Sequence, residues 1–238
     1  MMSPYGEFLI DFERKHAGFT HRNDPRNTKA AIIVETRPLF FLPRVIRNVM
    51  YFLGPEWNLE VLTGPMAYDF VGESLPGWDA RIGVLPWNPL VLTRQDYSRY
   101  LMLPEFWQRL AEQTVLIFQP DSLMTGPGIA DWLGCDYVGA PCERLDETYV
   151  GCGGFSLRTR DAMIAALEQH RPAEGEPEDT FFSRAVRAVG GRMPDLASAA
   201  RFCLHFLYTG QQPLAVHGTD KYPHGLDVAR AVTAAIAY

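Results

Sequence analysis

The chain has 238 residues, of which 47% are hydrophobic and 21% charged, values typical of a soluble globular domain with an ample core. The formal net charge of −6 provides no basic surface for a phosphate backbone, which excludes nucleic acid as the principal partner. No apolar run approaches the ~20 residues of a membrane span, and the N-terminal residues do not follow the pattern of a secretory signal. We therefore expect a cytoplasmic protein without a transmembrane segment.

The cysteine pattern is consistent with a cytoplasmic protein. Cys135, Cys142, Cys152 and Cys203 form no CxxC pair, and they are too sparse to build a disulfide scaffold. We expect them to be reduced thiols that behave as small buried hydrophobic residues.

Predicted strands and helices alternate along the first half of the chain. Residues 1–28 are mostly polar and are expected to form an N-terminal extension, followed by a single domain over residues 29–238. Continuous apolar runs with β-branched residues predict strands, and apolar residues at helical spacing predict helices. The predicted strands lie within residues 29–36, 57–64, 80–87, 113–122, 135–141, 150–160 and 213–222. The predicted helices lie within residues 42–53, 93–112 (broken at Pro104), 160–170, 174–191 (after an acidic loop) and 198–208.

This alternation predicts an α/β fold with a mostly parallel, doubly wound sheet and helices on both faces. Ligands of such sheets bind at the carboxyl ends of the strands. Asp121 follows one apolar strand, and Glu35, Thr36 and Arg37 follow another. The sequence therefore places the site at this edge of the sheet.

Two features offer candidate metal ligands. Gln119, Pro120 and Asp121 end an apolar strand, where a carboxylate can serve a hard divalent cation, although a strand-end acid also serves as a turn residue or helix cap. His217 follows a short apolar run, and a histidine there is either structural or a metal ligand.

Two further features lie in the second half of the chain. Gly151, Gly153 and Gly154 permit positive φ and a close approach of the backbone to a ligand, or they simply form a bulge. Glu178 and Asp179 begin a predicted helix, where acids suit the macrodipole and the cap. One of the two acids would then be free to act as a general base.

Taken in order, these features resemble the GT-A glycosyltransferases. The resemblance is closest to a poorly characterised bacterial family described only as a domain of unknown function, and it covers about residues 29–220. The motifs that carry it are "IIVE" with "RNVM" behind it, "LIFQ-D", "DYVGAP", "GGFSLR", "EDTFFS" and the late histidine. The resemblance implies a GT-A-like fold and a cytoplasmic bacterial enzyme of glycan biosynthesis.

The resemblance also implies a divalent cation, Mn²⁺ or Mg²⁺. Asp121 matches the last acid of the metal-binding DxD motif, and His217 matches the histidine that completes the metal and diphosphate site. Gln119 stands where the first acid would be. Because an amide offers an oxygen but no charge, the metal is expected to be bound more weakly, shared differently or absent.

The implied reaction is inverting transfer of a sugar, most simply from a UDP- or GDP-sugar, to an acceptor hydroxyl on a glycan, lipid-linked, peptide or small-molecule acceptor. Asp179 matches the usual base, and Glu178 lies beside it to contact donor or acceptor hydroxyls. Gly153 and Gly154 match the loop against the donor sugar. The residues that match the region holding the nucleotide base and ribose are Val34, Glu35, Thr36 and Arg37.

Side chains of two other kinds suit this chemistry. Arginine binds phosphate oxygens bidentately, which makes Arg37, Arg94 and Arg158 candidate phosphate contacts, with surface ion pairs as the alternative. Aromatic rings stack on sugars or fill the core. The aromatic candidates are Trp78, Trp87, Tyr97, Tyr149, Phe181 and Phe182.

Two other functions stay open. A sugar nucleotidyltransferase shares the doubly wound sheet, but no GxGxR-like loop follows the first predicted strand. A degenerate protein that only binds a sugar nucleotide or a partner is compatible with Gln119. The sequence also leaves open the role of residues 1–28 and a homo-oligomeric state.

Overall fold

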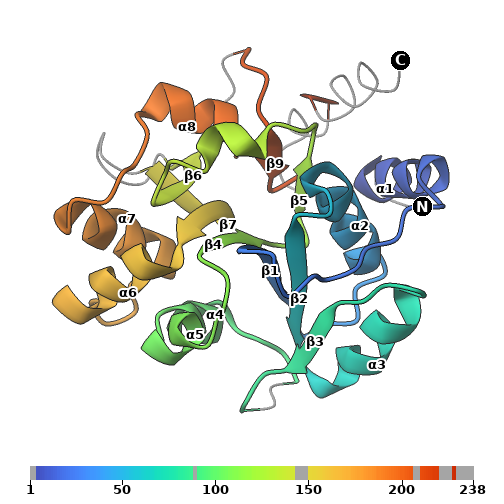
Figure 1. Ribbon diagram of the computed structural model, residues 1–238, viewed down its shortest axis with the longest axis horizontal. Helices are drawn as coiled ribbons and strands as arrows, with labels where there is room; N and C mark the ends of the chain where they lie inside the picture. The colour runs from blue at the N-terminus through green and yellow to red at the C-terminus, as the bar shows by residue number, and fades with distance from the viewer. Residues whose placement is uncertain (1–3, 88–89, 143–149, 206–209, 220–226, 229–238) are drawn as a thin grey trace.

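The computed structural model describes residues 4–87, 90–142, 150–205, 210–219 and 227–228. Its strands are β1 Lys29–Val34, β2 Trp57–Thr63, β3 Arg81–Val84, β4 Thr114–Phe118, β5 Ser122–Met124, β6 Tyr137–Pro141, β7 Val150–Thr159, β8 Cys203–Leu204 and β9 Ala215–His217. Its α-helices are α1 Pro4–Lys15, α2 Leu42–Leu53, α3 Pro65–Ser74, α4 Arg94–Leu101, α5 Pro104–Gln108, α6 Arg160–Gln169, α7 Glu178–Ala188 and α8 Leu196–Phe202 (Figure 1).

The central sheet has six strands in the order β3-β2-β1-β4-β7-β6. Strands β3, β2, β1 and β4 are parallel to one another, whereas β7 runs antiparallel to both β4 and β6. A second, three-stranded sheet has the order β5-β9-β8. The predicted α/β fold with a mostly parallel sheet is confirmed.

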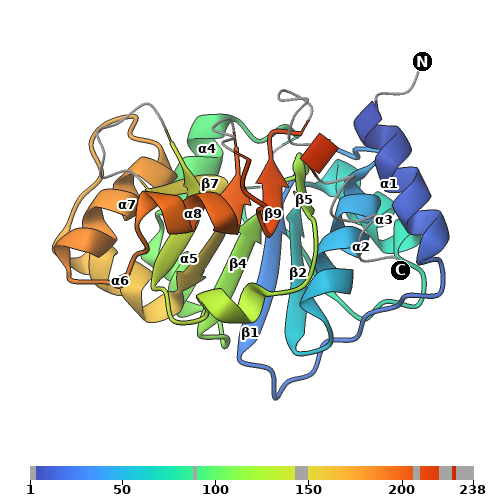
Figure 2. The same cartoon turned by 90° about the horizontal axis from the view of Figure 1, so that it is seen from above.

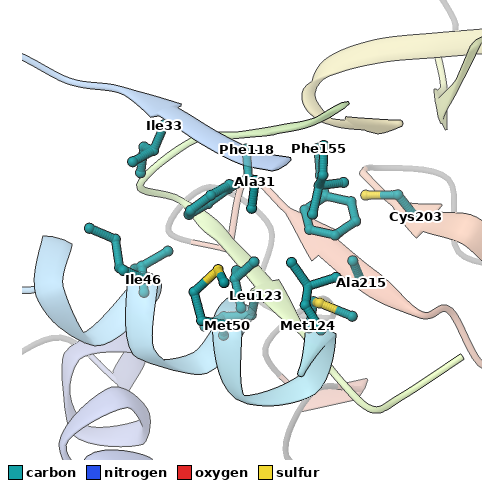
Figure 3. Packing of buried hydrophobic residues seen from close by; sticks show 14 of the residues in the cluster. Ala31, Ile33, Ile46, Met50, Phe118, Leu123, Met124, Phe155, Cys203 and Ala215 are labelled. Atoms are coloured by element: carbon teal, nitrogen blue, oxygen red, sulfur yellow. The ribbon is translucent and has the colours of Figure 1, made fainter. Parts of the chain in front are cut away.

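Helices cover both faces of the central sheet (Figures 1 and 2). Strand β1 shows why, because its apolar residues alternate between two cores: Ala31 and Ile33 belong to the core that contains α1 and α2, and Ile32 to the core that contains α5, α6 and α7. In Figure 3, Met50 of α2 points toward residues of both sheets. The second sheet is therefore packed against the first through a shared apolar core.

Local signals fix several element boundaries. Helix α2 has a proline in its first turn and ends before Gly54, whose N–H donates to the carbonyl of Met50 and whose positive φ of 79° turns the chain out of the helix. Helix α4 is capped by Thr93, whose side chain accepts from the backbone N–H of Asp96. The break predicted at Pro104 separates α4 from α5.

Four elements differ from the sequence-based expectation. Within the N-terminal 28 residues, α1 packs on α2 with Leu9 buried, so this segment is not simply a polar arm. Helix α3 was not expected, because only two of its residues are buried and its apolar pattern is weak. The predicted strand over 113–122 is two strands, β4 and β5, in different sheets. The predicted helix over 198–208 ends at Phe202 and gives way to β8, and residues 206–208 lie outside the described residues.

Among the residues that the structure describes, no helix has the length and apolar character needed to cross a membrane.

Candidate functional site

A pocket of ≈ 690 Å³ opens at the carboxyl ends of β1 and β4, as expected for ligand binding in such a sheet. Its lining residues are Val34, Glu35, Arg37, Leu39, Phe41, Leu92, Thr93, Arg94, Tyr97, Gln119, Pro120, Asp121, His205 and His217. Eight of the candidate residues meet here: Val34, Glu35, Arg37, Arg94, Tyr97, Gln119, Asp121 and His217. Segments far apart in the sequence thus form one concave surface.

The turn that carries Asp121 is fixed by hydrogen bonds to β7, to α1 and to the residue after β9. The N–H of Gln119 donates to the carbonyl of Gly154 at 2.9 Å, which keeps the turn against β7. The hydroxyl of Tyr5 in α1 donates to the carbonyl of Pro120. The carbonyl of Asp121 accepts from the backbone N–H of Gly218 at 2.9 Å. The proline has no N–H to continue the β4 ladder, and the chain leaves the central sheet at this point.

His217 is the centre of the site. Its Nε2 lies 3.3 Å from Oδ1 of Asp121 and 3.2 Å from Oε1 of Gln119, and its Nδ1 lies 3.4 Å from Sγ of Cys152. The imidazole of His205 stacks on it with ring centroids 4.8 Å apart and an interplanar angle of 20°. Both ring nitrogens of His217 therefore face polar partners.

Sheet register explains this convergence. In the antiparallel β5–β9 pair, Ser122 lies opposite His217, which brings the imidazole beside Asp121, one residue earlier. In the parallel β8–β9 pair, Leu204 lies opposite Val216, so the following residues, His205 and His217, are neighbours. Two short strands thereby supply both histidines to the end of β4.

The electrostatics couple Cys152 to His217. Burial disfavours a charge on either group, but His217 lies next to the Cys152 thiol and lowers the pKa of that thiol. Burial likewise acts against the imidazolium, yet Cys152 and Asp121 raise the pKa of His217. The surroundings therefore favour a positive charge at His217, on the wall of the pocket.

The glycines of β7 serve close packing. A Cβ on Gly154 would lie 2.0 Å from Nε2 of His217, and a Cβ on Gly153 would lie 2.2 Å from Oε1 of Glu178. The three glycines were expected to permit positive φ or to form a bulge, and of the three only Gly151 has a positive φ, at 146°. The bulge alternative is confirmed, because the β6–β7 register shifts at this stretch, where Gly139 pairs with Ser156 but Ala140 pairs with Cys152. Gly153 and Gly154 lie against protein side chains outside the pocket lining.

Asp179 and Glu178 take different places at the start of α7. Oδ2 of Asp179 accepts from the N–H of Gly153 at 3.1 Å, so this half-buried carboxylate sits next to the strand that abuts His217. Glu178 is buried and forms a two-bond ion pair with Arg158, at 2.7 and 3.1 Å. Neither acid is among the residues that line the pocket.

Arg158 is wholly buried between the rings of Tyr137 and Phe182. Its expected phosphate contact is therefore wrong, because the guanidinium is committed to Glu178 inside the core. Burial alone would lower the pKa of Arg158, but the carboxylate of Glu178 raises it. The sequence offered no signal for this pair, whose members are 20 residues apart on different elements.

The other two arginines border the pocket. Both Nε and one terminal nitrogen of Arg37 donate to the carboxylate of Glu35, at 2.8 and 2.7 Å, while the side chain stays 55% exposed. Arg94 lines the pocket at the start of α4. Thr36 is buried, and its hydroxyl accepts from the N–H of Leu92, which ties the two pocket walls together.

Of the aromatic candidates, only Tyr97 lines the pocket. Phe181 and Phe182 are completely buried in the core, and Trp78 packs against Phe19. Trp87 is 42% exposed. Tyr149 lies outside the described residues.

The expected divalent cation has a suitable set of ligand atoms. Oδ1 of Asp121, Oε1 of Gln119 and Nε2 of His217 approach one another on the pocket wall. A carboxylate, an amide oxygen and an imidazole suit Mn²⁺ better than Mg²⁺, which prefers oxygen ligands throughout. The predicted ligands Asp121 and His217 are therefore close enough to share an ion once Nε2 has lost its proton.

A family model described as "Protein of unknown function (DUF5672)" matches residues 80–217, more than half of the chain. The chain belongs to this DUF5672 family. The match includes the turn at Asp121, the glycines of β7, the start of α7 and His217, but not the β1 side of the pocket. None of the curated proteins matches the sequence.

Among solved structures, the chain is similar to the apo form of the glycosyltransferase GlyE from Streptococcus pneumoniae TIGR4, with a TM-score of 0.52 and 11% sequence identity. The similarity covers 87% of this chain and 60% of the GlyE chain, so this DUF5672 chain spans less than two thirds of that protein. At this identity the likeness establishes a shared fold.

Proposed function

We propose that this DUF5672 protein transfers a sugar from a nucleotide-diphosphate donor to an acceptor hydroxyl. The observation that carries the proposal is the pocket at the ends of β1 and β4, which joins Arg37, Arg94 and His217 to the acids Glu35 and Asp121. A glycosyltransferase-like fold supports the reaction class. Function still has to be argued from the site, because one fold hosts many activities.

The positive groups of the pocket suit a diphosphate. Arg37 and Arg94 offer guanidinium donors to phosphate oxygens, and the charge favoured at His217 stabilises the negative charge that develops on the leaving diphosphate. A Mn²⁺ held by Asp121 and a neutral His217 would instead supply Lewis-acid stabilisation of the same leaving group. Val34 and Glu35, which line the pocket at the end of β1, would hold the nucleoside.

Asp179 is the proposed base. Its carboxylate is fixed by the N–H of Gly153, and the next residue along β7, Gly154, packs against His217. The acceptor hydroxyl would lose its proton to Asp179 as the sugar–oxygen bond forms. A second hollow of ≈ 540 Å³, lined by Arg94, Arg99 and Pro177 among others, borders the start of α7 and provides an approach for the acceptor. Glu178 positions this region through its ion pair with Arg158.

The donor assignment is tested by thermal unfolding with UDP, GDP, CDP, TDP and their sugars, with and without Mn²⁺ or Mg²⁺. A ligand at 100 times its dissociation constant adds about 2.7 kcal/mol of stability. We expect one nucleotide family to raise the Tm, and Arg37→Gln to remove the shift. Arg26→Gln is the matched control, because Arg26 pairs with Asp24 on the exposed surface. No shift with any nucleotide would reject a nucleotide-sugar donor.

A further inference from the structure

Three metal-binding side chains converge beside the pocket without having been expected to do so. The ligand atoms of Cys152, His205 and His217 all lie within 4.8 Å of one another. Cys152 comes from β7, His205 follows β8 and His217 ends β9, so the group joins the central sheet to the second sheet. The sequence pattern predicted Cys152 only as a buried hydrophobic residue and did not single out His205.

We propose that Cys152, His205 and His217 bind a thiophilic divalent metal ion, zinc in the first place. Thiolate sulfur lies about 2.3 Å and imidazole nitrogen about 2.0–2.1 Å from zinc, so in a tetrahedral site the two atoms are roughly 3.6 Å apart. The observed separation of Sγ of Cys152 from Nδ1 of His217 is 3.4 Å. These two atoms would therefore need to move apart by only about 0.2 Å to share an ion.

Nε2 of His217, the nitrogen that would not bind the metal, already has polar partners, as is usual in a metal-binding histidine. Metal-binding histidines commonly donate their second N–H to a carboxylate or carbonyl, which orients the ring and raises its basicity. Here Nε2 faces Oδ1 of Asp121 at 3.3 Å and Oε1 of Gln119 at 3.2 Å. Asp121 would then orient His217 through Nε2 and leave Nδ1 for the metal.

The ligand types select the metal. Thiolate and imidazole favour zinc over the hard ions Mg²⁺ and Mn²⁺. Cys152 is buried, whereas His205 and His217 line the pocket, so the fourth coordination position of a tetrahedral ion would face the pocket. Water or a ligand oxygen would fill that position, as in zinc sites that act on substrates.

This site differs from the cation expected at Asp121 and His217, since the two use opposite nitrogens of the same imidazole. The proposed transfer reaction uses the same imidazole, but it is tested separately, by the effect of nucleotides on thermal unfolding. If the protein binds zinc but no nucleotide raises its Tm, the metal site is supported and the proposed sugar transfer is rejected.

The test is titration of the chelator-stripped, full-length protein with Co²⁺, followed by displacement with Zn²⁺. We expect one equivalent of Co²⁺ to produce the near-ultraviolet sulfur-to-cobalt charge-transfer band, and zinc to abolish it. Cys152→Ser should lose the band, whereas Cys135→Ser, a half-buried cysteine elsewhere, should keep it. Asp121→Asn should retain the band but weaken zinc affinity about 10- to 100-fold.

A second variant guards against a folding defect in Cys152→Ser. His205→Gln changes a half-buried side chain and should weaken cobalt and zinc binding at an unchanged Tm of the apo protein. The proposal is overturned if the wild type gives no thiolate band, or if the band survives Cys152→Ser. It is equally overturned if the protein binds Mn²⁺ in place of zinc, with affinity that depends on Asp121 and not on Cys152.

Discussion

Gly154→Ala perturbs the site without changing any of its polar groups. The added methyl carbon would lie 2.0 Å from Nε2, 2.1 Å from Cε1 and 2.4 Å from Cδ2 of His217. Ordinary non-bonded contacts are about 3.5 Å or longer, so the imidazole or the strand must move by about 1.5 Å. The imidazole has little room, because it is 7% exposed, stacked on His205 and bonded on both edges.

The cost follows from two effects. Overpacking a dense interior costs about 1–3 kcal/mol, and loss of a charge-assisted hydrogen bond to Asp121 adds about 1.5–3 kcal/mol. We expect Gly154→Ala to reduce the free energy of unfolding by about 3–5 kcal/mol, or to lower the Tm by roughly 6–20 °C in a chain of this size. A displacement of this size should also abolish donor binding.

Urea denaturation of Gly154→Ala beside Gly72→Ala measures the effect. Gly72 lies exposed within α3, and a Cβ there meets nothing within 4 Å. Alanine at that position should leave stability unchanged or raise it by about 0.5–1 kcal/mol. If Gly154→Ala unfolds like the wild type, the close packing of β7 against His217 does not exist in solution.

Three further substitutions test other parts of the structure by the same denaturation assay. Leu9→Ala, at a fully buried position of α1, should cost about 2–5 kcal/mol, while exposed Glu7→Ala should cost nothing measurable; equal effects would make the N-terminal helix a detachable extension. Asn48→Leu removes a buried amide that bonds both backbone groups of Met124 in β5, and should lower the free energy of unfolding by about 2–4 kcal/mol. No change in stability would mean that water replaces the amide as the hydrogen-bond partner of Met124. Glu178→Gln leaves a buried guanidinium without its carboxylate and should cost about 3–5 kcal/mol, most of it recovered when Arg158 is also replaced by methionine; a double mutant no better than the single would refute the coupling.

The central sheet followed from the sequence because its strands carry long apolar runs. Residues 29–34 and 57–63 are covered on both faces, and their composition shows it. Helix α2 was equally clear, since Gly54 ends an amphipathic segment. The antiparallel direction of β7 left no mark in the sequence, because pairing direction depends on how the chain returns to the sheet.

The second sheet was beyond prediction for a related reason. A strand was predicted within residues 213–222, where β9 lies, but β8 has only two residues and is too short to show alternation. Their pairing brings His205 to His217 and His217 to Cys152. The group of Cys152, His205 and His217 therefore forms only through tertiary contacts and could not be predicted from the sequence. By contrast, Gln119 and Asp121 could be placed from the sequence, because they follow a strand whose end could be identified.

Release of the nucleoside diphosphate from a sugar donor tests the proposed function most directly. With the donor identified by thermal unfolding, the account predicts steady release by the wild type, stimulated by acceptor. Asp179→Asn should lower the rate by about 10²- to 10⁴-fold, as expected for loss of a general base, with donor affinity unchanged. A donor that binds to the wild type but releases diphosphate no faster than with Asp179→Asn would contradict glycosyl transfer and make the protein a sugar-nucleotide binder.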